Sequence, residues 1–111
     1  MKQPSRVQFA DERIKKAFED LLKSGKECQE MHVQLMRAFT EIEENAFCGI
    51  QVPKKLIPKY YIKKYHVHNL WKYNLPGAWR LLYSIESDGL IVISIVLEWA
   101  NHKGYERRFR Y

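Results

Sequence analysis

The feature that most constrains this chain is an aliphatic run, residues 90–97, that directly follows the dipeptide Asp88-Gly89. Asp-Gly between two aliphatic-rich stretches predicts a β-hairpin, because both residues tolerate the positive φ of a tight turn. The run is apolar on both faces, whereas a half-exposed strand would alternate with period two. The sequence therefore predicts a hairpin whose second strand is central in a sheet.

The hairpin register has a functional consequence. A loop of two residues places Arg80 opposite Leu97, and a loop of four places it opposite Ile95. In both cases Arg80, the one charge inside the first strand, lies near the end of the second strand, just before His102 and Tyr105. We therefore expect a guanidinium, an imidazole and a phenol at one end of the sheet.

The first half of the chain predicts one strand and two helices. Residues 6–10 alternate between polar and apolar and lead into Asp11, a good helix cap. Apolar residues at helical spacing then predict a helix that ends near Gly25 and a second helix over 27–47. The connection between them is short enough to force an antiparallel helical hairpin.

A further strand is predicted over residues 69–75, ending at Pro76-Gly77. Pro-Gly favours a type II turn, which suits a two-residue hairpin poorly, so the loop should be longer than two residues. Pairing across this loop places Lys72 and Tyr73 beside Arg80 or one residue away. A second cation therefore joins the same end of the sheet.

Residues 51–66 have a different composition, with five lysines, three tyrosines and two prolines. Pro58 predicts the start of a short helix through Tyr65. Lysines interleaved with aromatic residues suit single-stranded RNA, because ammonium groups neutralise phosphates while rings stack on bases. A basic surface loop whose tyrosines fill gaps in the core is an equal alternative. The candidate RNA-binding lysines here are Lys54, Lys55, Lys59, Lys63 and Lys64.

The charge and the compartment narrow the classes of partner. The net charge is +6, from 19 Lys and Arg against 13 Asp and Glu, which suggests a polyanionic partner such as nucleic acid, an acidic protein or a membrane surface. No apolar run is long enough to cross a membrane, and the first twenty residues lack the apolar core of a signal peptide. We therefore expect a cytoplasmic protein with no membrane partner, in which Cys28 and Cys48 are free thiols.

The residues at the end of the sheet suit cleavage of RNA without a metal. Such a reaction uses the 2′-hydroxyl as nucleophile and needs a base, an acid and cations around the phosphate. Arg80 is the candidate phosphate ligand, and His102 is the candidate for proton transfer near neutral pH. Lys72, Lys103 and Tyr105 can supply charge, proton transfer or base stacking.

Other roles for these residues remain open. Glu98 or Glu106 could act as the base, and Arg80 could instead pair with Glu98 across the hairpin. Tyr105 could anchor the C-terminal segment to the core, as Phe109 could, with the neighbouring arginines in solvent. His66 and His68 have strand spacing, but no nearby Cys, Asp or Glu completes a ligand set, so no metal or cofactor is predicted.

The segments Trp79-Arg80-Leu81-Leu82-Tyr83 and His102-Lys103-Gly104-Tyr105-Glu106-Arg107-Arg108-Phe109 resemble those of the RelE/ParE superfamily of type II toxins. The resemblance covers most of residues 1–111, expected to form a single domain. It implies an α+β fold of order β-α-α-β-β-β, with an antiparallel sheet, a helical hairpin on one face and an open basic face. Residues 51–66 depart from the family pattern.

The resemblance also implies a function. RelE-like members are endoribonucleases that cleave mRNA on the ribosome, leave a 2′,3′-cyclic phosphate, need no cofactor and are neutralised by an antitoxin protein. It implies catalytic roles for Arg80, Lys72 and either His102 or Tyr105, with Lys103 and Arg107 adding to RNA binding. The alternatives are a ParE-like inhibitor of DNA gyrase and a non-catalytic RNA- or protein-binding member of the same fold.

Overall fold

A computed structural model describes residues 2–109, with the side chains of His102 and Arg108 excepted. It confirms the α+β class. The strands are β1 (Arg6–Phe9), β2 (Ile50–Gln51), β3 (Trp71–Leu75), β4 (Trp79–Asp88) and β5 (Ile91–Ala100). The helices are α1 (Glu12–Asp20), α2 (Lys26–Glu44), α3 (Lys59–Tyr65) and α4 (His102–Phe109). β2 and α4 are additions to the predicted elements, whereas α3 was expected.

The strands form one mixed sheet in the order β1-β5-β4-β3-β2. The antiparallel prediction is correct for β2 to β5 and wrong for β1, which pairs parallel with β5. β1 lies at an edge, as expected. Its direction depends on where the chain must turn to begin α1, and alternation within four residues carries no information about that direction.

The predicted hairpin is present, but its loop is shifted by one residue. Asp88 pairs with Ile91, so the loop consists of Gly89 and Leu90 instead of Asp88-Gly89. Gly89 has a φ of 64°. Glycine enters this left-handed region without the steric cost that a Cβ would bring, so it takes the first loop position.

β5 also carries an unmatched residue. Leu82 pairs with Glu98 and Tyr83 pairs with Val96, so Leu97 has no partner and forms a β-bulge. Leu97 is buried against the same face of the sheet as Leu82. The Glu98 carboxylate lies on that face as well, because it accepts a hydrogen bond from a tyrosine in that cluster.

The shifted loop and the bulge together move Arg80. It lies opposite Ala100, so the predicted partners Leu97 and Ile95 are wrong. The displacement brings Arg80 closer to the C-terminal segment than predicted, because Ala100 is the last residue of β5.

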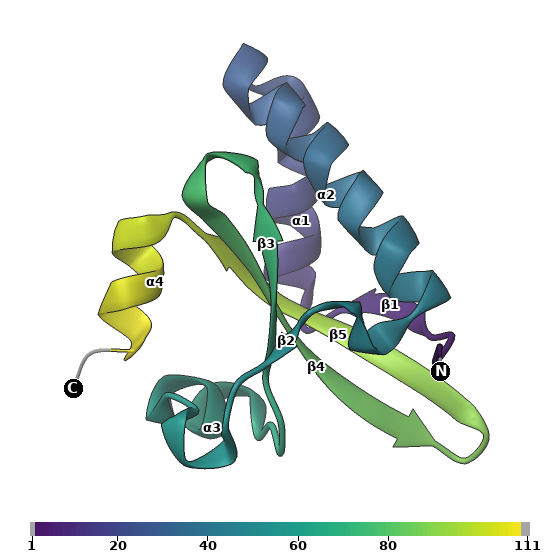
Figure 1. Ribbon diagram of the computed structural model, residues 1–111. Helices are drawn as coiled ribbons and strands as arrows, with labels where there is room; N and C mark the ends of the chain where they lie inside the picture. Colours follow the sequence, from purple (N-terminus) through teal and green to yellow (C-terminus); the bar gives the residue numbers. More distant parts are fainter. Residues whose placement is uncertain (1, 110–111) are drawn as a thin grey trace.

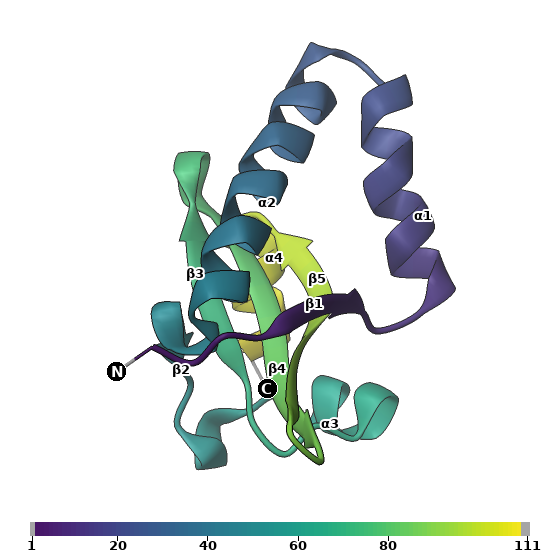
Figure 2. The same ribbon diagram turned by 90° about the vertical axis from the view of Figure 1, so that its right-hand side faces the viewer.

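The helical hairpin packs on one face of the sheet, as predicted, and Figure 2 shows α1 and α2 side by side. Asp11 caps α1, since its side chain accepts a hydrogen bond of 2.9 Å from the backbone nitrogen of Ile14. The buried residues of this first core are Ile14, Phe18, Met31, Leu35, Ala38, Phe39, Ile42, Leu75, Leu81, Tyr83 and Val96.

The opposite face is not open, which corrects the expectation of an open basic face. Figure 1 shows α3 and α4 on the side of the sheet away from α1 and α2. Leu82 and Leu97 are fully buried on this face, and an uncovered face would leave both in water. The buried residues of this second core are Val52, Ile57, Tyr61, Val67, Leu70, Leu82 and Leu97, with Tyr105 and Phe109 of α4 packed against it.

Candidate nucleic-acid interface

Three of the predicted catalytic residues meet on the second face. Lys72 of β3 and Arg80 of β4 are half-buried, and Tyr105 of α4 lies over both. The Lys72 ammonium donates a hydrogen bond of 3.3 Å to the Tyr105 hydroxyl and lies 5.3 Å from the centre of its ring. The Arg80 guanidinium carbon is 5.7 Å from the same ring centre. The predicted convergence of Lys72, Arg80 and Tyr105 is thus present.

The strand register explains this convergence. Lys72 pairs with Leu82, and Asn74 pairs with Arg80, so Lys72 and Arg80 belong to the same alternating set of side chains. Tyr73 was also predicted to lie near Arg80, but it pairs with Leu81 and packs against the first core. Lys72 is therefore the cation that β3 contributes.

One buried donor of Arg80 is unsatisfied by the described residues. Its Nη1 donates a hydrogen bond of 3.1 Å to the backbone oxygen of Trp79. Its Nε is buried and has no hydrogen-bond partner among the described residues. A buried donor without a partner costs about 1–3 kcal/mol, and such groups are often found where a side chain serves function.

A tyrosine that sequence reasoning did not select also belongs to this face. The hydroxyl of Tyr61, a buried residue of α3, donates a short hydrogen bond to Oε2 of Glu98. Glu98 shares the face because of the bulge at Leu97. A buried tyrosine needs a partner for its hydroxyl, which is the signal that could have drawn attention to Tyr61.

His102 begins α4, but its side chain lies outside the described residues. Asn101 precedes it, and its side chain accepts a hydrogen bond of 2.9 Å from the backbone nitrogen of Gly104. Positions 102 and 105 are three residues apart on the helix, a spacing at which positions are neighbours on its surface. Glu106, the other carboxylate considered as a base, is exposed on α4.

The predicted RNA-binding cations surround the second face. They come from the Lys54–Leu56 turn, from α3 and from α4, which all lie on this side of the sheet (Figure 1). All of them are exposed: Lys54, Lys55, Lys59, Lys63, Lys64, Lys103 and Arg107. Their positions allow them to neutralise the backbone of a bound strand.

Lys64 is attached to the tyrosines of its own helix. It donates a hydrogen bond of 3.2 Å to the Tyr60 hydroxyl, which raises the pKa of Lys64. Its ammonium lies 5.4 Å from the ring centre of Tyr60 and 5.4 Å from that of Tyr65. Lys64 thus keeps its charge while it holds two rings in place.

The chain matches no protein-family model, and neither curated proteins nor solved structures show a match to it. None of the helices within residues 2–109 has both the length and the apolar character needed to cross a membrane. Among the described side chains, no three His, Cys, Asp or Glu residues are grouped as they would be around a metal ion. Cys28 and Cys48 are free thiols.

Proposed function

We propose that this chain is a RelE-like toxin, a cytoplasmic endoribonuclease that cleaves mRNA on the ribosome and is neutralised by an antitoxin protein. The observation that carries the proposal is the cluster of Lys72, Arg80 and Tyr105, in which a buried guanidinium donor lacks a partner. Two cations and a phenol at one point suit a phosphodiester better than they suit a neutral or cationic substrate.

In this proposal each residue has one role. Arg80 binds the scissile phosphate through its guanidinium, and Lys72 stabilises the negative charge that builds on it. The Tyr105 hydroxyl accepts a hydrogen bond from Lys72, so its own proton remains available for donation. Histidine is the residue type that ordinarily exchanges protons nearest to neutral pH, so His102 is assigned the proton of the 2′-hydroxyl.

The reaction is an internal transfer. The 2′-oxygen forms a bond to phosphorus as the bond from phosphorus to the 5′-oxygen breaks. The proton of the 2′-hydroxyl goes to His102, and the leaving 5′-oxygen takes a proton from Tyr105. The products are a 2′,3′-cyclic phosphate and a 5′-hydroxyl, so a new 5′ end should resist ligation until it has been phosphorylated.

The test is primer extension on a reporter mRNA after induction of wild-type protein, Arg80→Ala and Arg37→Ala in parallel. Arg37 is the matched control, because it is an exposed arginine on α2, on the other side of the sheet. We expect new cleavage sites with the wild type and with Arg37→Ala, and a loss of roughly 10²–10³-fold with Arg80→Ala.

Other outcomes identify the alternatives. Intact mRNA with altered plasmid supercoiling in the same cultures would replace the proposal with a ParE-like action on gyrase. Intact mRNA with unchanged supercoiling would replace the proposal with a non-catalytic binding protein. Cleavage that survives Arg80→Ala would show that the cluster is not the active site.

A further inference from the structure

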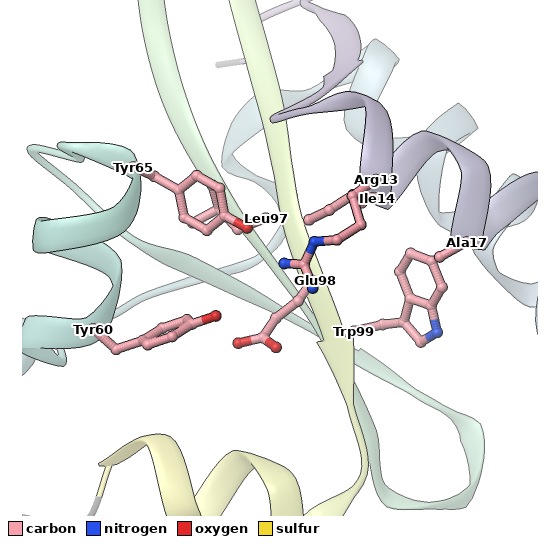
Figure 3. A pocket seen from close by; sticks show the side chains of 8 residues that line it. All are labelled: Arg13, Ile14, Ala17, Tyr60, Tyr65, Leu97, Glu98 and Trp99. Carbon is pink, nitrogen blue, oxygen red and sulfur yellow. The ribbon is translucent and has the colours of Figure 1, made fainter.

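A cavity of about 210 Å³ lies between α1, α3 and β5. It is smaller than the roughly 300–1,000 Å³ pockets that hold drug-sized ligands, so it suits a single ring system. Its lining residues are Arg13, Ile14, Ala17, Tyr60, Tyr65, Leu97, Glu98 and Trp99. Figure 3 shows the rings of Tyr60 and Tyr65 on one side, with the Arg13 guanidinium and the Glu98 carboxylate reaching toward the space beside them.

The lining combines flat aromatic surfaces with one cation and one anion. Tyrosine rings at the wall suit a planar aromatic ligand, since bases stack on such rings. The guanidinium offers donors, and the carboxylate offers acceptors. The ligand should therefore be a flat ring that presents acceptors along one part of its edge and donors along another.

Guanine fits this description better than the other bases. Its O6 and N7 are neighbouring acceptors that arginine can bind with two hydrogen bonds. Its N1–H and N2 amino group are neighbouring donors, which a carboxylate can accept with its two oxygens. Adenine, cytosine and uracil each lack one of these paired arrangements.

We propose that this pocket binds a guanine base of an RNA strand, with Arg13 on the acceptor edge, Glu98 on the donor edge, and Tyr60 or Tyr65 stacked on the ring. Both polar groups are positioned by neighbours. Arg13 interacts with the Tyr65 side chain, which raises the pKa of its guanidinium. Glu98 accepts a hydrogen bond from Tyr61.

The pocket adjoins the cluster through the sheet. Lys72 pairs with Leu82, and Leu82 pairs with Glu98, so the three residues form one row across β3, β4 and β5. Two strand spacings amount to roughly 10 Å, which separates Lys72 from Glu98. The idea that this base belongs to a nucleotide near the scissile phosphate rests on the proposed nuclease function. The binding of guanine does not.

The test is to titrate the purified full chain with each of the four ribonucleoside 3′-monophosphates. Binding is monitored by the NMR signal of the Trp99 indole. We expect 3′-GMP to bind at least about fivefold more tightly than the other three, the lower limit for a bidentate contact. Glu98→Gln and Arg13→Ala should each remove that preference, while Arg37→Ala keeps it. Equal binding of all four nucleotides, no binding at millimolar concentration, or a preference that survives both substitutions would each overturn the inference.

Cleavage assays separate this inference from the proposed function. If 3′-GMP binds selectively but no RNA is cut, the pocket stands and the nuclease proposal falls. If RNA is cut without regard to guanine, the nuclease stands and the pocket inference falls. If Glu98 recognises guanine, Glu98→Gln should lower the ratio of cleavage at guanine sites to cleavage at adenine sites. A uniform loss at all sites would instead make Glu98 the general base and overturn its role in the pocket.

Discussion

The two faces of the sheet are both covered by helices, yet they differ in chemistry. The first face, under α1 and α2, is packed with aliphatic and aromatic side chains around Leu35 and Ile42, which are fully buried. The second face, under α3 and α4, also has an apolar core, but ionisable side chains surround it, including Lys72, Arg80 and Glu98. The difference suggests a division in which the first face mainly stabilises the fold, whereas the second also carries the candidate site.

The largest expected effect tests the first half of this comparison. Leu35→Ala removes three heavy atoms from a fully buried side chain, so the free energy of unfolding should fall by about 3–4 kcal/mol. Urea denaturation measures the loss. Cleavage per folded molecule should stay at the wild-type level, and a specific loss of cleavage would show that the first face also serves function.

The next effect tests the second face. Lys72→Met keeps the length of the side chain and removes the ammonium, so cleavage should fall about 10²-fold, equivalent to about 2.7 kcal/mol in the barrier. The free energy of unfolding should change by less than about 1 kcal/mol, because Lys72 is only half-buried. Lys26→Met, at an exposed lysine of α2, is the matched control and should cleave normally.

Tyr83 sharpens the comparison, because it is a polar group inside the first core. Its hydroxyl donates a hydrogen bond of 2.7 Å to the backbone oxygen of Ala46 and accepts one of 3.1 Å from the nitrogen of Gly49. Tyr83→Phe should lower the free energy of unfolding by about 2 kcal/mol, since both backbone groups lose this partner. Cleavage per folded molecule should be unchanged, and a large loss would move Tyr83 into the site.

The same residue predicts a pH dependence. Burial raises the pKa of Tyr83, so the folded state favours the neutral phenol. The resulting stabilisation is complete below the ordinary tyrosine pKa of about 10 and is lost as the pH rises above it, because the unfolded phenol then ionises first. In denaturation at rising pH, the deficit of Tyr83→Phe relative to wild type should shrink above pH 10. A constant deficit would contradict this prediction.

The smallest effect concerns strain outside both faces. Ala78, in the loop between β3 and β4, has a φ of 63°, which a residue with a Cβ rarely adopts. Ala78→Gly should raise the free energy of unfolding by about 1 kcal/mol. Thermal denaturation and the cleavage assay together check it. A gain in stability accompanied by a loss of cleavage would show that the strain serves function.

Local patterns predicted much of the fold. Helical spacing identified α1 and α2, and the Asp88-Gly89 signal identified the hairpin to within one residue. The bulge at Leu97 could not be predicted, because a run that is apolar at all but one position does not show which residue belongs to which face. For the same reason the sequence did not show that apolar residues on the second face would require α4 as a cover.

The candidate site divides in the same way. Strand pairing predicted that Lys72, Arg80 and Tyr105 would meet, since each lies on or beside a recognisable strand. Tyr61 and Arg13 could not be placed, because their neighbours depend on how α1 and α3 pack against β5. Contacts of this kind arise from the tertiary structure, and spacing within the sequence does not encode them.

The bulge in β5 also determines toward which face of the sheet each side chain of this strand points. Up to Val96, even-numbered positions of the strand face the first core and odd-numbered positions face the second. After Leu97 the assignment reverses, so that Trp99 packs against the first core and Glu98 faces the other side. A regular strand of the same sequence would instead turn the Glu98 carboxylate toward the first core, where a charge costs free energy unless it is paired. The bulge at Leu97 thus keeps the Glu98 carboxylate out of the apolar first core.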